Sequence, residues 1–138
     1  MPILKISSTG PIEYLNGERI DNMILSGIVA EAILSVGSQL VMSITGHKKE
    51  IELRPWSYAH DELGLNTMSL RALLKCIQYL ELSLSEVEIR IWFFKNNENL
   101  DGDAPYQVLR DAGNDIVCNN VINHAIFYER FVNKKAKK

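Results

Sequence analysis

The chain has 138 residues, 46% of them hydrophobic, and a formal net charge of −2 at pH 7. This length and composition fit one domain with an ordinary hydrophobic core, or at most two small subdomains. They exclude a protein that holds a polyanion by its overall charge, and also a membrane-spanning protein, because no segment approaches about 20 consecutive apolar residues.

The N-terminal part combines a helical pattern with an alternating one. Residues 1–18 contain Pro and Gly too often for a regular element beyond a short extended piece. From Arg19 to about Gly37, apolar residues recur at helical spacing, which predicts a helix. Between residues 40 and 54, apolar residues alternate on both sides of a Gly-His-Lys-Lys turn, and Pro55 has no amide hydrogen to continue a strand ladder. This stretch predicts a β-hairpin.

Two further helices are predicted after the hairpin, over Ser57–Leu63 and Leu70–Leu80. Two helices with a short link also occur in the helix-turn-helix, whose second helix reads DNA. That second helix offers only Arg71, Lys75 and Gln78 to a groove, whereas base reading depends on several donors. An ordinary helical hairpin is therefore the favoured interpretation. Weak nucleic-acid binding, helped by the lysine-rich C-terminal tail, is the alternative.

The segment Glu86–Phe94 is compatible with either a helix or a strand. Apolar residues alternate with charged or bulky ones, as in a strand, at Val87, Ile89, Ile91 and Phe93. Two pairs, Ser83 with Glu86 and Ser85 with Glu88, however, have the S-x-x-E spacing whose side chains satisfy the free amides at the start of a helix. We favour the helix, and the strand stays open as the alternative.

The polar stretch after this segment predicts a structured connector. Asn96, Asn97 and Asn99 suit turns because their side chains bond to nearby backbone. Leu100 can anchor the loop in the core, and Gly102 permits a tight reversal. A small acidic group in the same stretch has too few oxygen donors, and the wrong spacing, for a calcium loop.

A short helix should follow the connector. Asp103 can cap its first turn, and Pro105 fits there because that position needs no amide donor. Gly113 can adopt the left-handed conformation that ends a helix.

The last helix is predicted over Asp115–Val132, and its two faces can be assigned at 100° per residue. The inward face should carry Val117, Cys118, Val121, Ala125, Tyr128 and Val132. On the opposite, polar face we expect Ile126 at the centre. An apolar centre with a polar rim is typical of a protein interface. The predicted partner-binding residues are Ile122, Asn123, Ile126, Phe127 and Arg130. Packing of this face against the N-terminal half is the alternative.

Nine positions in the C-terminal third to half of the chain form a spaced pattern of apolar, turn and helix-start residues: Trp92, Asn97, Leu100, Gly102, Pro105, Leu109, Gly113, Val117 and Val121. In order and spacing this pattern resembles the toxin-binding domain of Xre, MbcA and ParS antitoxins. The resemblance implies a helical module that binds and silences a partner toxin, typically a RES-fold enzyme that acts on NAD. It also favours the helix over the strand at Glu86–Phe94.

Catalysis has little support in the sequence. His47, His60 and His124 have no nearby Ser, Cys or carboxylate at a spacing that recurs in nucleophilic sites. Cys76 and Cys118 lie at inward positions of predicted helices, which indicates buried thiols in a reducing compartment, and no N-terminal signal pattern is present. We therefore expect a cytoplasmic protein that is not an enzyme and has no cofactor or metal site.

Together these features predict a mainly α fold with one β-hairpin at about residues 40–54. The N-terminal region should cover residues 1–56 and the toxin-binding-like module residues 57–138, unless both form one compact domain. The predicted function is that of an antitoxin-like inhibitor, a homo-oligomer that covers the active site of its toxin without binding a membrane. The alternatives are a small DNA-binding regulator, a structural or oligomerisation module, and a small enzyme.

Overall fold

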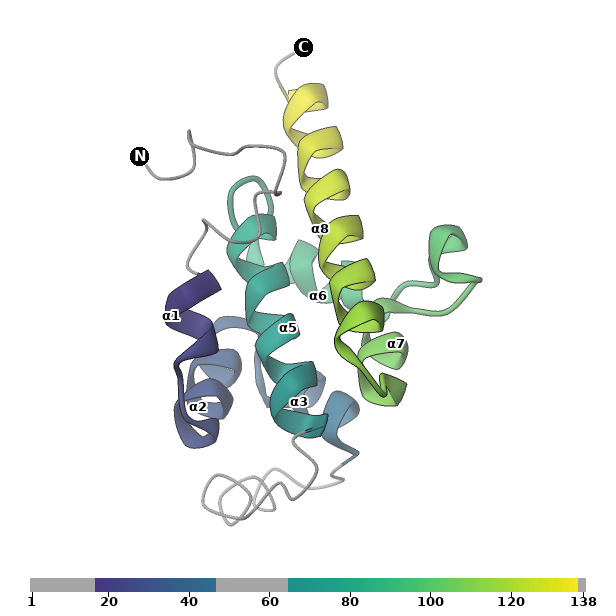
Figure 1. Ribbon diagram of the computed structural model, residues 1–138. Helices are drawn as coiled ribbons and strands as arrows, with labels where there is room; N and C mark the ends of the chain where they lie inside the picture. Colours follow the sequence, from purple (N-terminus) through teal and green to yellow (C-terminus); the bar gives the residue numbers. More distant parts are fainter. Residues whose placement is uncertain (1–16, 47–64, 137–138) are drawn as a thin grey trace.

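A computed structural model of the chain describes residues 17–46 and 65–136. Within these ranges the chain is mainly helical, as predicted (Figure 1). The elements are α1 (Gly17–Asp21), α2 (Leu25–Val36), α3 (Ser38–Thr45), α5 (Leu65–Leu80), α6 (Glu86–Phe94), the 3-10 turn η4 (Glu98–Leu100), α7 (Pro105–Asp111) and α8 (Asp115–Ala136). None of the helices in these two ranges combines the length and apolar character needed to cross a membrane.

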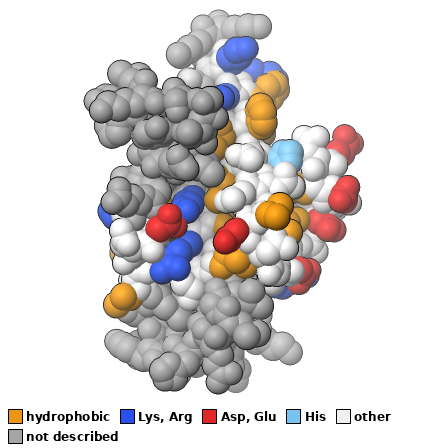
Figure 2. Space-filling view, in the orientation of Figure 1, with side chains coloured by type: hydrophobic (Ala, Val, Ile, Leu, Met, Phe, Trp, Pro, Cys, Tyr) orange, Lys and Arg blue, Asp and Glu red, His pale blue; other side chains and the backbone are white. Residues whose placement is uncertain are grey.

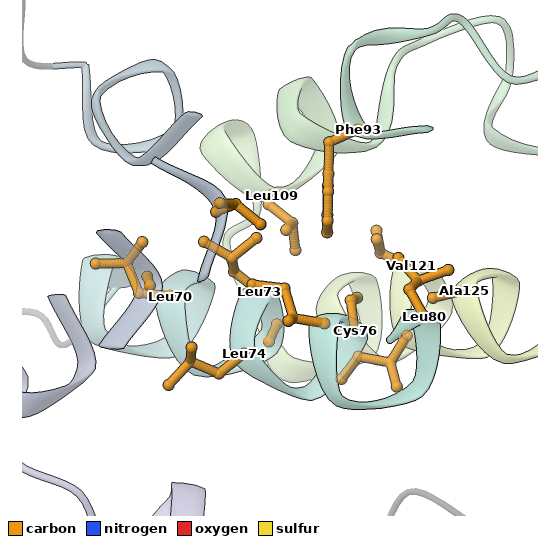
Figure 3. Close-up of a cluster of buried hydrophobic side chains, with 14 of the residues drawn as sticks. Leu70, Leu73, Leu74, Cys76, Leu80, Phe93, Leu109, Val121 and Ala125 are labelled. Atoms are coloured by element: carbon orange, nitrogen blue, oxygen red, sulfur yellow. The ribbon is translucent and has the colours of Figure 1, made fainter. Parts of the chain in front are cut away.

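Helix α5 lies at the centre of the core and contacts α1, α2, α3, α7 and α8. Its apolar side chains recur every three or four residues and are completely buried at Leu70, Leu73, Leu74, Ile77 and Leu80. Phe93 of α6, Leu109 of α7 and Val121 of α8 point toward this row (Figure 3). The described parts of the N-terminal and C-terminal halves therefore share one hydrophobic core.

The predicted strand at residues 40–45 is wrong, because this segment is helix α3. Leu40, Val41 and Ile44 are buried, at helical spacing, where α3 contacts α2, α5 and α7. Leu40, Met42 and Ile44 also alternate, so the pattern alone fits both structures. No strand is present in the ranges 17–46 and 65–136, while the second half of the predicted hairpin and the helix predicted at Ser57–Leu63 lie outside them.

The helix predicted from Arg19 to Gly37 is divided in two. Helix α1 ends at Asp21 and α2 begins at Leu25, and the amide of Met23 donates to the carbonyl oxygen of Ile20 (3.1 Å) between them. Arg19 reaches back from α1 to α2, where its guanidinium binds Glu31 through two hydrogen bonds of 3.0 and 3.2 Å. The apolar spacing continues through this break, so the sequence pattern does not reveal it.

Helix α6 confirms the favoured prediction of a helix, and not a strand, for residues 86–94. The Ser85 hydroxyl accepts a hydrogen bond from the amide of Glu88 (3.3 Å), and the Glu88 carboxylate accepts one from the amide of Ser85 (2.8 Å). These two bonds form the second of the two predicted capping boxes, whereas the Ser83 hydroxyl donates to the carboxylate of Glu129 (2.5 Å) instead. The bond from the Ser85 amide lowers the pKa of Glu88.

Replacing Ser85 with Ala should lower the free energy of unfolding by about 1 kcal/mol, because the amide of Glu88 loses its acceptor. Urea denaturation at neutral pH measures the change. Ser85→Asp is the matched control because Asp also caps helices.

Since the folded-state pKa of Glu88 is lowered, its carboxylate contributes to stability at neutral pH. This contribution is lost as the pH falls through the folded-state pKa. Equal stability of Ser85→Ala and the unchanged protein would contradict the capping role.

The polar stretch after α6 is a structured connector, as predicted. The Asn97 side chain accepts from the amide of Asn99 (2.9 Å), and the Asn97 backbone accepts from Leu100 (2.9 Å) and Gly102 (3.0 Å). Leu100 is buried, and both Asp101 and Gly102 have positive φ angles, of 59° and 84°. The reversal that needs glycine is therefore at Gly102.

Both ends of α7 differ in detail from the prediction. Pro105 is the first helical residue, as expected, but Ala104 occupies the cap position and its amide donates to the Gln107 side chain (2.9 Å). The Asp103 carbonyl instead accepts from the amide of Asn97, within the connector (3.1 Å). Gly113 does not have a positive φ angle, and α7 ends without a left-handed residue.

Candidate interaction surface

The inward face of α8 is wider than predicted and is rotated toward Ile122. Helix α8 contacts both α5 and α7, and Cys118, Val121 and Ala125 are buried as predicted. Ile122 and Ile126 are buried as well, with exposed fractions of only 1% and 6%. Their expected exposure is therefore wrong, because two packing partners cover a broader arc of the helix than one. Of the residues predicted to bind a partner, Asn123, Phe127 and Arg130 are exposed.

A continuous exposed stripe runs along α8 opposite this buried face. We call it the α8 face and define it as Ile116, Asn120, Asn123, Phe127, Arg130 and Phe131, spaced three, four or one residue apart. Its apolar members have exposed fractions of 78% at Ile116, 67% at Phe127 and 53% at Phe131. Hydrophobic side chains are visible at intervals along α8, between polar ones (Figure 2). An exposed row of large apolar side chains with polar neighbours is typical of a protein-binding surface.

Ile116 and Phe131 were missed by the sequence analysis, although a signal was present. Phe131 follows Phe127 by one helical turn, and Ile116 precedes Phe127 by three helical turns. Ile126, the predicted centre of the surface, is buried. Tyr128, predicted to face inward, is exposed, and its ring lies 6.2 Å from the ring of the buried Trp92, measured between centroids.

A groove of about 680 Å³ lies beside the N-terminal half of α8. The connector and α7 form its other wall, and its lining residues are Asn99, Leu100, Asp101, Asp103, Gln107, Val108, Asp111, Ile116, Val117, Asn119, Asn120 and Asn123. All charged residues in this lining are acidic. Asp111 is paired with Arg110 (3.0 Å), whose hydrogen bond lowers the pKa of Asp111. Asp101 and Asp103 are exposed, and acidic side chains gather over the connector (Figure 2).

A second hollow of about 530 Å³ lies on the other side of the connector. Ile91, Trp92 and Tyr128 supply its apolar part, and polar residues of α6 and the connector surround them. The connector thus separates two concave regions, and only the groove of 680 Å³ is continuous with the α8 face, through Ile116 and Asn123.

The positions that carry the antitoxin resemblance lie mostly under the surface. Trp92, Leu100, Pro105, Leu109 and Val121 are buried. Of the remaining positions, Asn97 and Val117 are half-buried, and Gly102 and Gly113 are exposed. These residues fix the connector and α7 against α8, and the side chains that a partner could touch come from other positions.

The structure describes one of the three histidines of the chain. His124 is half-buried on α8, and His47 and His60 lie outside the described ranges. Within residues 17–46 and 65–136, no group of three or more His, Cys, Asp or Glu side chains could hold a metal. Cys76 and Cys118 are buried free thiols, and burial raises the pKa of both, that of Cys118 to about 11. Neither is a thiolate nucleophile at neutral pH.

The α8 face and the adjoining acidic groove are therefore features of the described surface that a partner could use. Both lie next to buried residues of α7, α8 and the connector, which anchor these elements in the core. Comparison of the chain with known protein families, curated proteins and solved structures finds no match.

Proposed function

We propose that this protein is an antitoxin-like inhibitor that binds a partner toxin through the α8 face. The observation that supports it is the exposed row Ile116, Phe127 and Phe131 on a helix whose other side is anchored in the core. Large apolar and aromatic side chains, ringed by amides and an arginine, match the composition of binding hot spots. The resemblance of the C-terminal part to Xre, MbcA and ParS antitoxins points to a toxin as the class of partner.

Inhibition by such a surface needs no chemistry from the inhibitor. A rigid helix placed over the mouth of an active site excludes the substrate, and affinity comes from a few anchors inside a rim that excludes water. The resemblance suggests a RES-fold enzyme that acts on NAD as the toxin. On this proposal the protein acts in the cytoplasm and uses neither cofactor nor metal.

The arrangement of α5 gives less support to the alternative of a DNA-binding regulator. Arg71 donates to the backbone carbonyl of Met23 (2.8 Å), and the Lys75 ammonium lies 2.7 Å from the Asp21 carboxylate. Both of these groove-reading candidates are therefore engaged within the fold. The apolar side of α5 is also covered by other helices, which leaves little of it for a DNA groove.

Replacing Phe127 with Asp should weaken binding to the cognate toxin at least thirtyfold. A charge placed at the centre of a desolvated interface costs at least about 2 kcal/mol of binding free energy, which is the threshold that defines a hot spot. Calorimetric titration with the purified toxin measures the affinity, and growth of cells that express the toxin reports neutralisation. Replacement of Asn123 or Arg130 with Ala should weaken binding less, because rim residues contribute less.

Leu34→Asp is the matched control, because Leu34 is an exposed apolar residue on α2, away from α8. It should bind and neutralise the toxin like the unchanged protein. If Phe127→Asp neutralises equally well, the toxin does not use the α8 face. If no RES-fold or other toxin encoded beside the gene binds the chain, the antitoxin proposal itself is wrong.

A further inference from the structure

The α8 face and its surroundings carry opposite charges at their two ends. Beside the N-terminal half of α8, the exposed carboxylates of Asp101 and Asp103 line the groove of 680 Å³. Near the C-terminal end, the exposed charged residues are Arg130, Lys134 and Lys135. The surface is therefore acidic at one end and basic at the other, with apolar side chains along its length.

The basic end is also an accessible end. The last turns of α8 extend beyond the end of α5, and the helix is long enough to separate the two ends clearly (Figure 1). Ile116 and Phe131 are 15 residues apart, or about 22 Å at 1.5 Å per residue. The Lys135 ammonium lies 4.8 Å from the centroid of the Phe131 ring, so positive charge and an exposed aromatic ring are presented together.

We propose that a second copy of this chain docks on the α8 face, with the two α8 helices antiparallel. A twofold axis close to Asn123 places Ile116 of one copy opposite Phe131 of the other. The same axis brings the basic end of each helix to the acidic groove of the other copy. Leu100, Val108 and Val117 provide apolar lining there for the aromatic ring.

Self-complementarity favours a second copy over an unrelated partner. A twofold interface uses the same patch on both subunits, so each feature of the patch must find its complement elsewhere on that patch. In the proposed dimer, each acidic groove faces the basic end of the other copy. Each Ile116 faces the Phe131 of the other copy. An unrelated basic peptide would satisfy the groove and leave Phe127, Phe131 and the basic end uncovered.

This proposal does not depend on the toxin. Its regulatory consequence does rest on the proposed function. If the α8 face also binds a toxin, the second copy and the toxin compete for this face, and the toxin binds the monomer. Oligomeric state is measured on the chain alone, and toxin neutralisation is measured separately, so either idea can fail without the other.

A charge exchange between two variants provides the test. The first variant is Arg130→Glu with Lys134→Glu, and the second is Asp101→Lys with Asp103→Lys. Each variant alone places like charges at both ends of the interface, so its dimer dissociation constant should rise about tenfold or more. In an equimolar mixture both ends carry opposite charges, and the heterodimer should form. Light scattering coupled to size-exclusion chromatography measures the mass in each case, and all four positions are exposed.

Lys95→Glu is the control, because Lys95 is exposed and lies outside the α8 face and its groove. It should leave the dimer unchanged. A second measurement locates the axis: Asn123→Cys should form a disulfide between copies on oxidation, whereas Leu34→Cys should not. A monomeric unchanged protein, variants that stay dimeric alone, or a mixture that fails to associate would each overturn the proposal.

Discussion

Replacing Ile126 with Asp should unfold most of the protein near its ordinary working temperature. Ile126 is buried in the core cluster, and Asp would bring a carboxylate there with no partner of opposite charge. Leaving a buried charge unpaired costs about 3–5 kcal/mol. The free energy of unfolding of a typical domain is about 5–15 kcal/mol, so this cost is a large part of it. Thermal melting followed by circular dichroism measures the effect as a large fall in Tm or the loss of a cooperative transition.

Phe127→Asp is the matched control for this variant, since it makes the same kind of change one residue further along. Phe127 is exposed, and a surface substitution of this kind changes stability by about 0.5 kcal/mol or less. The contrast between the two neighbours tests the rotation of α8 directly. Equal stability of the two variants would mean that α8 presents a different face to the core.

Replacing Phe93 with Ala should lower the free energy of unfolding by about 3–5 kcal/mol. Phe93 is among the largest completely buried side chains, and it points toward the row of leucines on α5 (Figure 3). Truncation removes its apolar contacts and leaves a cavity that the packed helices can close only in part. Urea denaturation, with the slope of the transition compared between variants, measures the loss.

Ile91→Ala is the informative control for Phe93→Ala. In the strand alternative for residues 86–94, Ile91 and Phe93 would lie on one face and both truncations would be costly. In helix α6, Ile91 is exposed while Phe93 and Ile89 are buried, so Ile91→Ala should cost less than about 1 kcal/mol. Large losses for both variants would contradict the helix.

The sequence by itself determined the features that depend on neighbouring residues. The capping box of Ser85 and Glu88 forms within one turn of helix, and Pro105 begins α7 because its ring fits the first helical position. The Asn-rich connector closes through bonds to its own backbone, and Gly102 supplies one of its two positive φ angles. Each of these features is settled by partners at most a few residues away, so the local pattern is sufficient.

The tertiary structure alone decided which of two compatible patterns is adopted and which side of a helix is buried. Residues 40–45 fit both a strand and a helix, and packing against α2, α5 and α7 selects helix α3. Ile122 and Ile126 were assigned to the surface from helical angles, but contact with both α5 and α7 buries them and leaves Ile116, Phe127 and Phe131 exposed. Helical periodicity gives the angle between two residues on one helix, whereas the direction of the core depends on neighbours that are distant in the chain.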